Sequence, residues 1–250
     1  MTALLASVSS TLEAVTAMEA GVDVIDLKNP AAGALGAVSD TMAREVVARV
    51  DGRVPVSATV GDLPLLPPRV VRAVAEKAAT GVDYVKLGLF GDGDMTGTLS
   101  ALQPIAGSTV KLVAVLFADR GVDLDLLPAI AEADFAGAML DTADKRAGGL
   151  RRHANNRLLH SFVNRCRDLG LLCGLAGSLG TADIAPLLEV APDLLGFRGA
   201  LCRRGQRTEG LDARAVASIR SLIPLKDRTA PTAISVHKRH GPLRRSGTAR

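Results

Sequence analysis

Two lysines stand inside apolar segments of this sequence, where a charged side chain is unusual. Lys28 ends the run DVIDLK, and Lys86 lies in the middle of YVKLGL. Lysine is almost never fully buried unless it is paired or functional. Asp26 precedes Lys28 by two residues, so both side chains lie on one face of an extended strand. The lysines are therefore either a catalytic pair or members of salt bridges, such as Asp26 with Lys86, that only stabilise the fold.

The catalytic interpretation is Schiff-base chemistry, which needs a neutral amine. An ordinary lysine, with a pKa of about 10.4, is neutral in only about four molecules in ten thousand at pH 7. Burial and a neighbouring cation both lower the pKa of a lysine. Two lysines in one cavity can therefore activate each other: one attacks a carbonyl carbon, while the other, or a carboxylate, moves protons.

A second group of residues is typical of phosphate binding. The segments LAGSLG and FRGALC each follow an apolar run late in the chain. Gly177 and Gly199 let backbone amides approach an anion, and Ser178 offers a hydroxyl group. Arg198 either adds positive charge or faces outward. The small residues of KNPAAGALGA (28–37) form either a lid over the site or an ordinary connection.

Eight short apolar runs alternate with stretches whose apolar residues recur every three or four positions. These stretches, such as TLEAVTAMEAG and VVRAVAEKAATG, are typical of amphipathic helices. The repeat length, roughly 25 to 30 residues, is the size of one βα unit. The runs predict strands at 3–8, 23–28, 54–60, 84–89, 110–117, 136–141, 171–177 and 193–199.

Near-continuous apolar strands need helices on their faces, which a barrel or an open doubly wound sheet provides. The open sheet usually carries a glycine-rich fingerprint after its first strand, but Ser-Val-Ser-Ser-Thr follows here. We therefore predict one α/β domain over residues 1–225, a single (β/α)₈ TIM barrel. Alternate strands of such a barrel fill one layer. Lys28, Lys86 and Asp141, on the second, fourth and sixth strands, should meet near the catalytic end, with Lys145 close by in DTADK.

The composition narrows the classes of function. Hydrophobic residues make up 48% of the chain and aromatic residues 2%, so single-stranded nucleic-acid binding, which relies on stacked aromatic rings, is disfavoured. Residues 226–250 hold seven Lys or Arg and one Asp, whereas the rest of the chain has a balance of −2. We expect a disordered basic C-terminal tail there, and a role on nucleic acid or an anionic surface is the less favoured alternative.

Other features predict the setting of the protein. The spacing of Cys166, Cys173 and Cys202 fits neither a disulfide framework nor a zinc site, so we expect free thiols, no metal and no cofactor. There is no signal-peptide pattern and no apolar stretch of about 18 residues. We therefore expect a cytoplasmic protein with no membrane partner. A homo-oligomer is left open.

The sequence resembles the (5-formylfuran-3-yl)methyl phosphate synthases, a family of methanofuran biosynthesis. The resembling segments run in order over residues 1 to about 225: DVIDLKNPAAGALGA, VSATVGDLP, GVDYVKLGLFG, AMLDTADK, LAGSLG and GFRGALC. IDLKNP and SATVGD are the most specific of them. Leu27 and Phe197 depart from the residues usual in the family, but neither is a named catalytic position.

The resemblance implies a lyase that condenses two molecules of glyceraldehyde 3-phosphate. The product would be 4-(hydroxymethyl)-2-furancarboxaldehyde phosphate, formed with loss of one phosphate and water. Lys28 would form the Schiff base, Lys86 would accept a proton, and Asp141 and Lys145 would line the site, with Asp26 beside them. A class I aldolase for another sugar phosphate and a non-catalytic phosphometabolite-binding barrel remain as alternatives.

The tail yields the first prediction. Because residues 226–250 have no apolar periodicity, a protein truncated after Leu225 should keep its turnover and its melting temperature. Both can be compared with the full chain. A fall in turnover of more than about tenfold, equal to roughly 1.4 kcal/mol of barrier, would show that the tail reaches the site.

Overall fold

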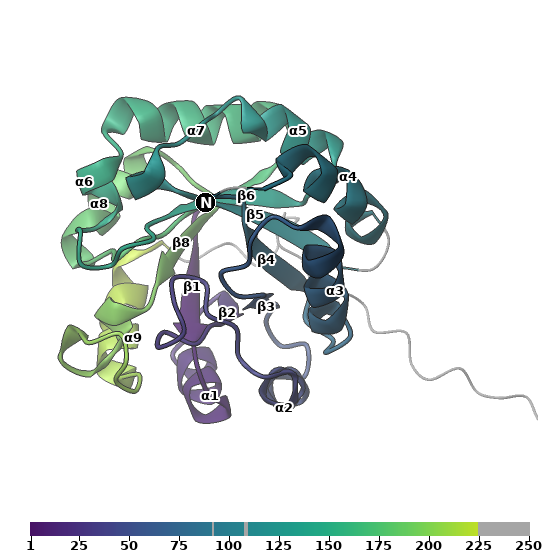
Figure 1. Ribbon diagram of the computed structural model, residues 1–250. Coiled ribbons are helices and arrows are strands. Elements are labelled where there is room, and N and C mark those ends of the chain that lie inside the picture. Colours follow the sequence, from purple (N-terminus) through teal and green to yellow (C-terminus); the bar gives the residue numbers. More distant parts are fainter. Residues whose placement is uncertain (92, 108–109, 225–250) are drawn as a thin grey trace, which may run out of the picture.

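The computed structural model describes residues 1–91, 93–107 and 110–224. In this part of the chain, parallel strands form a closed barrel in sequence order, and β8 pairs with β1 (Figure 1). The predicted (β/α)₈ barrel is thereby confirmed. The strands are β1 (Ala3–Val8), β2 (Val24–Leu27), β3 (Val56–Thr59), β4 (Tyr84–Gly88), β5 (Lys111–Phe117), β6 (Gly137–Asp141), β7 (Leu172–Leu175) and β8 (Leu194–Phe197).

Helices and short 3₁₀ turns connect the strands and surround the barrel (Figure 1). Several begin at a polar residue whose side chain accepts a hydrogen bond from the first turn, as Ser10, Ser39 and Asn155 do. Such a cap satisfies one of the amides that a helix cannot pair internally. The helical elements are α1 (Thr11–Glu19), α2 (Asp40–Val50), α3 (Pro67–Ala78), α4 (Met95–Ala106), η1 (Ala118–Arg120), α5 (Leu126–Glu132), α6 (Leu150–His153), α7 (Asn156–Asp168), α8 (Thr181–Glu189), η2 (Gly199–Leu201), η3 (Arg203–Gly205) and α9 (Ala213–Leu222).

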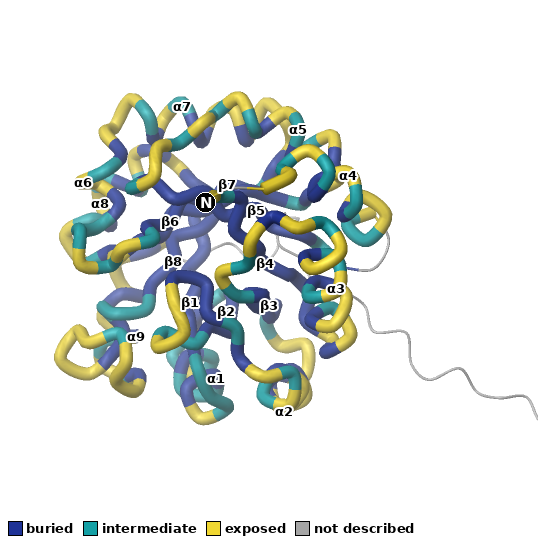
Figure 2. The backbone as a smooth tube through the Cα atoms, viewed as in Figure 1, coloured by how far each residue is buried: buried dark blue, intermediate teal, exposed yellow. Residues whose placement is uncertain are grey.

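Aliphatic side chains form two apolar layers. The larger lies between the strands and the helices, and the smaller fills the inside of the barrel with side chains such as Leu5, Val24, Val113 and Met139. In Figure 2 the strands are buried, while the outward parts of the helices are exposed. Branched and long aliphatic groups are the usual filling of a barrel interior. They leave the C-terminal ends of the strands to polar side chains.

The predicted strands agree with the observed ones in number and order, but several are shorter. The run 54–60 contains β3 (Val56–Thr59), and the run 193–199 contains β8 (Leu194–Phe197). Val60 leaves the strand yet stays buried, because its side chain belongs to the apolar layer between the strands and the helices. The apolar pattern of the sequence therefore predicts which residues are buried, but it overestimates how many of them pair with a neighbouring strand. The predicted tail, 226–250, lies outside the described residues.

A repeated two-bond motif fixes the opposite, N-terminal end of the barrel. The side chains of Asp23, Asp83 and Asp193, just before β2, β4 and β8, accept hydrogen bonds of 2.7, 2.8 and 2.8 Å from the amides of Leu4, Val56 and Cys173. The amide of each aspartate in turn donates to the carbonyl oxygen of the same residue. Each aspartate thus caps the start of the preceding strand, where an amide would otherwise lack a partner.

The cysteines answer one further expectation. Cys166, Cys173 and Cys202 are buried free thiols, as predicted. Within the described ranges, no helix has both the length and the apolar character needed to cross a membrane.

The capping motif predicts a stability effect far from the cavity. Asp193→Ala should lower the free energy of unfolding by about 1–2 kcal/mol, because the amide of Cys173 loses its partner. Asp193→Asn keeps an acceptor oxygen and should cost less. Urea denaturation of the three proteins gives the comparison, and equal losses in the two variants would contradict the capping role.

Candidate active site

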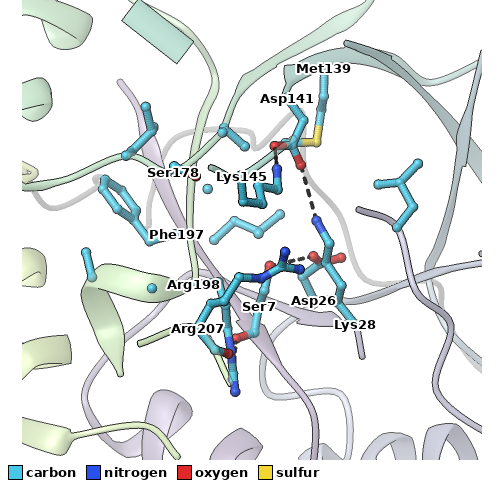
Figure 3. Close-up of a pocket in the computed structure, with 18 of the residues that line it drawn as sticks. Ser7, Asp26, Lys28, Met139, Asp141, Lys145, Ser178, Phe197, Arg198 and Arg207 are labelled. Atoms are coloured by element: carbon cyan, nitrogen blue, oxygen red, sulfur yellow. Dashed lines mark hydrogen bonds and ion pairs between the residues drawn. The ribbon is translucent and has the colours of Figure 1, made fainter. Parts of the chain in front are cut away.

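A cavity of about 450 Å³ opens among the C-terminal ends of the strands (Figure 3). This is the end at which barrel enzymes carry their active sites, and the volume suits a small metabolite. The residues predicted from the sequence all line it: Asp26, Lys28, Lys86, Asp141, Lys145, Gly177, Ser178, Arg198 and Gly199.

Asp26 and Lys86 form a buried ion pair at the floor of the cavity. The Nζ atom of Lys86 lies 2.6 Å from Oδ1 of Asp26. Ser57 donates a hydrogen bond of 2.7 Å to the same oxygen, and Ser7 donates one of 2.8 Å to Oδ2. Both serines are aligned with Asp26 on the flanking strands β3 and β1. The carboxylate is thus held from three sides, and the salt bridge considered as a purely structural alternative does exist.

Asp141, the last residue of β6, binds two lysines with one carboxylate (Figure 3). Oδ2 lies 3.2 Å from Nζ of Lys28, and Oδ1 accepts a hydrogen bond from Lys145. The amide of Thr142 also donates to Oδ1, at 2.7 Å. Lys28 reaches this position because its own amide donates to the carbonyl of Val8, which extends the pairing of β2 with β1 by one residue.

Burial and charge shift the pKa values of these groups in defined directions. Burial alone would raise the pKa of Asp26 and Asp141, but the charges of Lys86 and Lys28 on the first, and of Lys28 and Lys145 on the second, lower both. Burial lowers the pKa of Lys86 and of Lys145; in each case the charge of Lys28 adds to this, against the opposing effect of a carboxylate. The site therefore holds two firmly ionised carboxylates beside Lys86 and Lys145, which lose a proton more easily than an ordinary lysine.

Lys28 is the least constrained of the three lysines. Lys145 donates to Asp141 and to the carbonyl and hydroxyl oxygens of Thr142. Lys86 makes its close contact with a fixed carboxylate. Within the described part of the chain, Nζ of Lys28 has a single partner, at 3.2 Å. Of the three, its amine needs the smallest rearrangement to reach a ligand in the cavity.

The expected meeting of residues from alternate strands agrees with this geometry. Lys28, Lys86 and Asp141 all line the one cavity. The even numbers of the strands did not predict which residues form ion pairs. In the structure, Asp26 pairs with Lys86 and Asp141 pairs with Lys28. The catalytic roles of these residues stay predictions.

The two glycine-rich loops border the cavity as predicted. Gly177, after β7, has a φ of +112°, and a Cβ atom there would lie 3.0 Å from Thr142, so a side chain would be strained and crowded. Ser178 is exposed, with a φ of +48°, and Gly199 begins η2. The amides of these residues donate no hydrogen bond to any other described residue, which leaves them available to an anion.

Arg198 has a different position from the one a phosphate ligand needs. Nη1 lies 2.6 Å from Oε2 of Glu13, and Nη2 lies 3.1 Å from Oε1, so the guanidinium grips this carboxylate with both arms. The pairing, together with the amide and hydroxyl of Ser9, lowers the pKa of Glu13 against the effect of burial. The charge of Arg198 is neutralised by Glu13, and its predicted part in phosphate binding gains no support from this geometry.

Arg207, in the loop between η3 and α9, also lines the cavity, and the sequence analysis missed it. Its Nη2 donates a hydrogen bond of 3.1 Å to the carbonyl of Gly33. The signal was weak: Arg207 stands in GQRTEG, a polar segment with no apolar neighbour. Only the length of the connection after the eighth strand, at the catalytic end of the barrel, pointed to it.

The loop over residues 28–37 is fastened to the barrel at several points. Asp62 accepts hydrogen bonds of 2.9 and 3.0 Å from the amides of Ala34 and Leu35. Thr59 donates one of 3.0 Å to the carbonyl of Gly36. Leu35 is buried and lines the cavity. The loop thus covers one side of the site, while its predicted movement as a lid stays a prediction.

Metal ligands do not gather here. The described residues contain no group of three or more His, Cys, Asp or Glu side chains arranged to hold a metal ion.

Comparison with protein families gives one match over most of the chain. Residues 4–220 match the family described as 4-HFC-P synthase. A putative (5-formylfuran-3-yl)methyl phosphate synthase of Methylorubrum extorquens is 42% identical over 86% of this chain and 88% of its own length. The (5-formylfuran-3-yl)methyl phosphate synthase of Methanothermobacter thermautotrophicus is 36% identical over 88% of this chain and 98% of its own length.

Solved structures resemble the chain in fold. Phosphoribosyl anthranilate isomerase from Thermus thermophilus has a TM-score of 0.62 at 14% identity, covering 89% of this chain and 98% of its own. A 3-hexulose-6-phosphate synthase has a TM-score of 0.58 at 18% identity, covering 89% and 100%. At these identities the likeness is one of barrel architecture.

The lowered pKa of Lys86 predicts a pH dependence of stability. Unfolding free energy rises with pH wherever the unfolded chain binds more protons than the folded one. For Lys86 that window runs from its lowered folded pKa up to the ordinary lysine value of about 10.4. Wild-type protein should therefore gain stability between pH 7 and about 10 relative to Lys86→Met, in which this contribution is absent. Urea unfolding at several pH values measures the difference, and parallel pH profiles would contradict the prediction.

Proposed function

The chain belongs to the 4-HFC-P synthase family, and on that basis we propose that it makes (5-formylfuran-3-yl)methyl phosphate from two molecules of glyceraldehyde 3-phosphate. The overall reaction balances when one inorganic phosphate and two water molecules are lost. The observation that carries the proposal is the arrangement of Lys28 within the Asp26–Lys86 and Asp141–Lys145 pairs, below two loops with free amides. This arrangement brings together an amine nucleophile, proton-transfer groups and anion-binding groups.

In the proposed first step, the amine of Lys28 attacks the aldehyde carbon of one triose phosphate. A carbon–nitrogen bond forms, the carbonyl oxygen leaves as water, and an iminium ion results. Asp141 favours this step because its carboxylate faces the nitrogen at 3.2 Å and compensates the positive charge that the iminium retains. Lys28 suits the role because its amine has a single hydrogen bond to give up within the described ranges.

Lys86 suits the next step, which is proton removal. The iminium acidifies the hydrogen on the adjacent carbon, and the electron pair left behind is held in an enamine. That pair can then expel the phosphate group from the next carbon, so one of the two phosphates leaves without any oxidant or reductant. Lys86 is buried and its pKa is lowered, so it becomes the neutral amine that can act as a base more readily than an ordinary lysine does.

Asp26 and Lys145 are proposed to position the reacting groups. Asp26 is anchored by Ser7 and Ser57 and aligns Lys86. Lys145 donates a hydrogen bond to Oδ1 of Asp141, and this contact leaves Oδ2 directed toward Lys28. Gly177, Ser178 and Gly199 are proposed to bind the phosphate of the substrate through backbone amides and the Ser178 hydroxyl.

The proposed reaction is tested by ultraviolet absorption. A furan aldehyde absorbs in the ultraviolet, whereas the open-chain triose phosphate has no conjugated ring. Incubation of the protein with glyceraldehyde 3-phosphate should produce a rising furan absorbance together with one inorganic phosphate per product. A sugar phosphate formed without the absorbance would indicate a class I aldolase. Binding with no change of substrate would indicate a phosphometabolite-binding protein.

Lys28 is predicted to be the modified residue. Borohydride reduction in the presence of glyceraldehyde 3-phosphate should leave a stable adduct on the peptide that contains Lys28, which mass spectrometry can locate. Lys28→Arg keeps the positive charge facing Asp141 but has no amine for imine formation, so it is the matched control and should give no adduct. A stable adduct on another lysine, with Lys28 unmodified, would overturn the assignment.

Lys86→Met separates the two steps. The variant keeps most of the side-chain length and loses the amine. It should still form the adduct at Lys28, but its furan production should fall by about 10² or more. A folded Lys86→Met protein with near-normal turnover would leave Asp26, Asp141 or Lys145 as the proton-transfer group.

A further inference from the structure

The charges around the cavity are incompletely compensated. Among the described residues, its cationic side chains are Lys28, Lys86, Lys145, Arg198 and Arg207. Asp26 and Asp141 form ion pairs with the three lysines, and Glu13 forms one with Arg198. Arg207 forms no ion pair with any residue in the described ranges, although the charges of Asp141 and Asp62 act on it from a longer distance. A cavity with this excess of positive charge is suited to a ligand that carries two negative charges or more.

Arg207 is held in place by the residue that was expected to bind phosphate. Nε of Arg198 donates a hydrogen bond of 2.8 Å to the carbonyl of Arg207, and Nη2 donates one of 3.0 Å to the carbonyl of Glu209. Glu13, which orients Arg198, also accepts a hydrogen bond of 3.3 Å from the amide of Leu211. The backbone on both sides of Arg207 is thereby fixed, and this preorganisation lowers the entropic cost of binding a ligand.

The side chain of Arg207 reaches away from the glycine-rich loops. Its base lies beside Gly199, since a Cβ atom on that glycine would be 3.9 Å from Cβ of Arg207. Its guanidinium ends at the carbonyl of Gly33, in the loop after β2. Figure 3 shows Arg207 directed over the cavity toward Lys28, whereas Ser178 lies on the other side of Lys145 and Arg198 turns away. The guanidinium and the free amides thus border different parts of one cavity.

We infer that Arg207 binds the phosphate group of the second triose phosphate, in a subsite separate from the amides that follow β7 and β8. The inference rests on the proposed function, because only a reaction of two phosphorylated substrates needs two such subsites. A guanidinium suits the task, since it donates two parallel hydrogen bonds to phosphate oxygens and stays charged. The bond to Gly33 then either persists through a second N–H group or is exchanged for the ligand.

Inorganic phosphate tests the subsite without reference to catalysis. Equilibrium dialysis with radiolabelled phosphate should find two sites per wild-type chain and one in Arg207→Gln, or a second site weakened by about tenfold or more, the size expected for a lost charge-assisted hydrogen bond. Arg203→Gln is the matched control, because Arg203, in η3 of the same connection between β8 and α9, is exposed and does not line the cavity; it should keep both sites. Arg207→Lys keeps the charge and should be intermediate.

Two results would overturn the inference: unchanged phosphate binding in a folded Arg207→Gln protein, or a single phosphate site in the wild type. If Arg207→Gln fails to fold, Arg207→Lys decides, because loss of the paired guanidinium bonds should still weaken only one site.

A kinetic measurement assigns the subsite to the second substrate. In Arg207→Gln, trapping of the adduct at Lys28 should saturate at the same concentration of glyceraldehyde 3-phosphate as in wild type, whereas furan formation should need about tenfold more. Equal weakening of both would place Arg207 at the first substrate instead and overturn the assignment. Should the wild type form no furan at all, the proposed reaction fails, while the dialysis result on Arg207 stands by itself.

Discussion

Inside the barrel, two carboxylates hold three ammonium groups in a space lined largely by buried side chains. An isolated charge there would cost several kcal/mol. Each charged lysine therefore needs an ionised carboxylate close to it. Asp141 meets this constraint by sharing its two oxygens between Lys28 and Lys145. The sharing leaves Lys28 with one partner among the residues that the structure describes, and this incomplete pairing leaves the proposed nucleophile free to move.

Much of this arrangement could be predicted from the sequence, because it depends on patterns among residues that are close together in the chain. Apolar runs at regular intervals predicted the barrel, and a lysine within such a run, as at Lys86, had to be paired or functional. The position of Asp141 at the end of a predicted strand was sufficient to place it in one layer with Lys28 and Lys86, although not to pair it with Lys28. These inferences succeed because the closed barrel brings the ends of all its parallel strands to one rim.

The remaining parts depend on contacts between residues far apart in the chain. Arg198 follows the eighth strand in a glycine-rich loop, which favoured a phosphate ligand, but Glu13 takes up its charge from the first helix. No spacing rule relates two residues at opposite ends of the sequence. Arg207 was missed for a related reason: a polar loop has no periodicity, and the direction of its side chain is set by the hydrogen bonds that Arg198 donates to the loop.

The closure of the barrel by β1 and β8 has a consequence for synthesis of the protein on the ribosome. The first strand emerges early, yet its partner β8 (Leu194–Phe197) and the partner of Glu13 emerge only after most of the chain. Until then the edge of β1 stays open, and non-local pairing of this kind slows folding. Lys28, Lys86 and Lys145 are therefore synthesised before the barrel that surrounds them can close. Because the ion pair of Glu13 with Arg198 also orients the loop of Arg207, the proposed second phosphate subsite can form only after β8 and this loop have been synthesised.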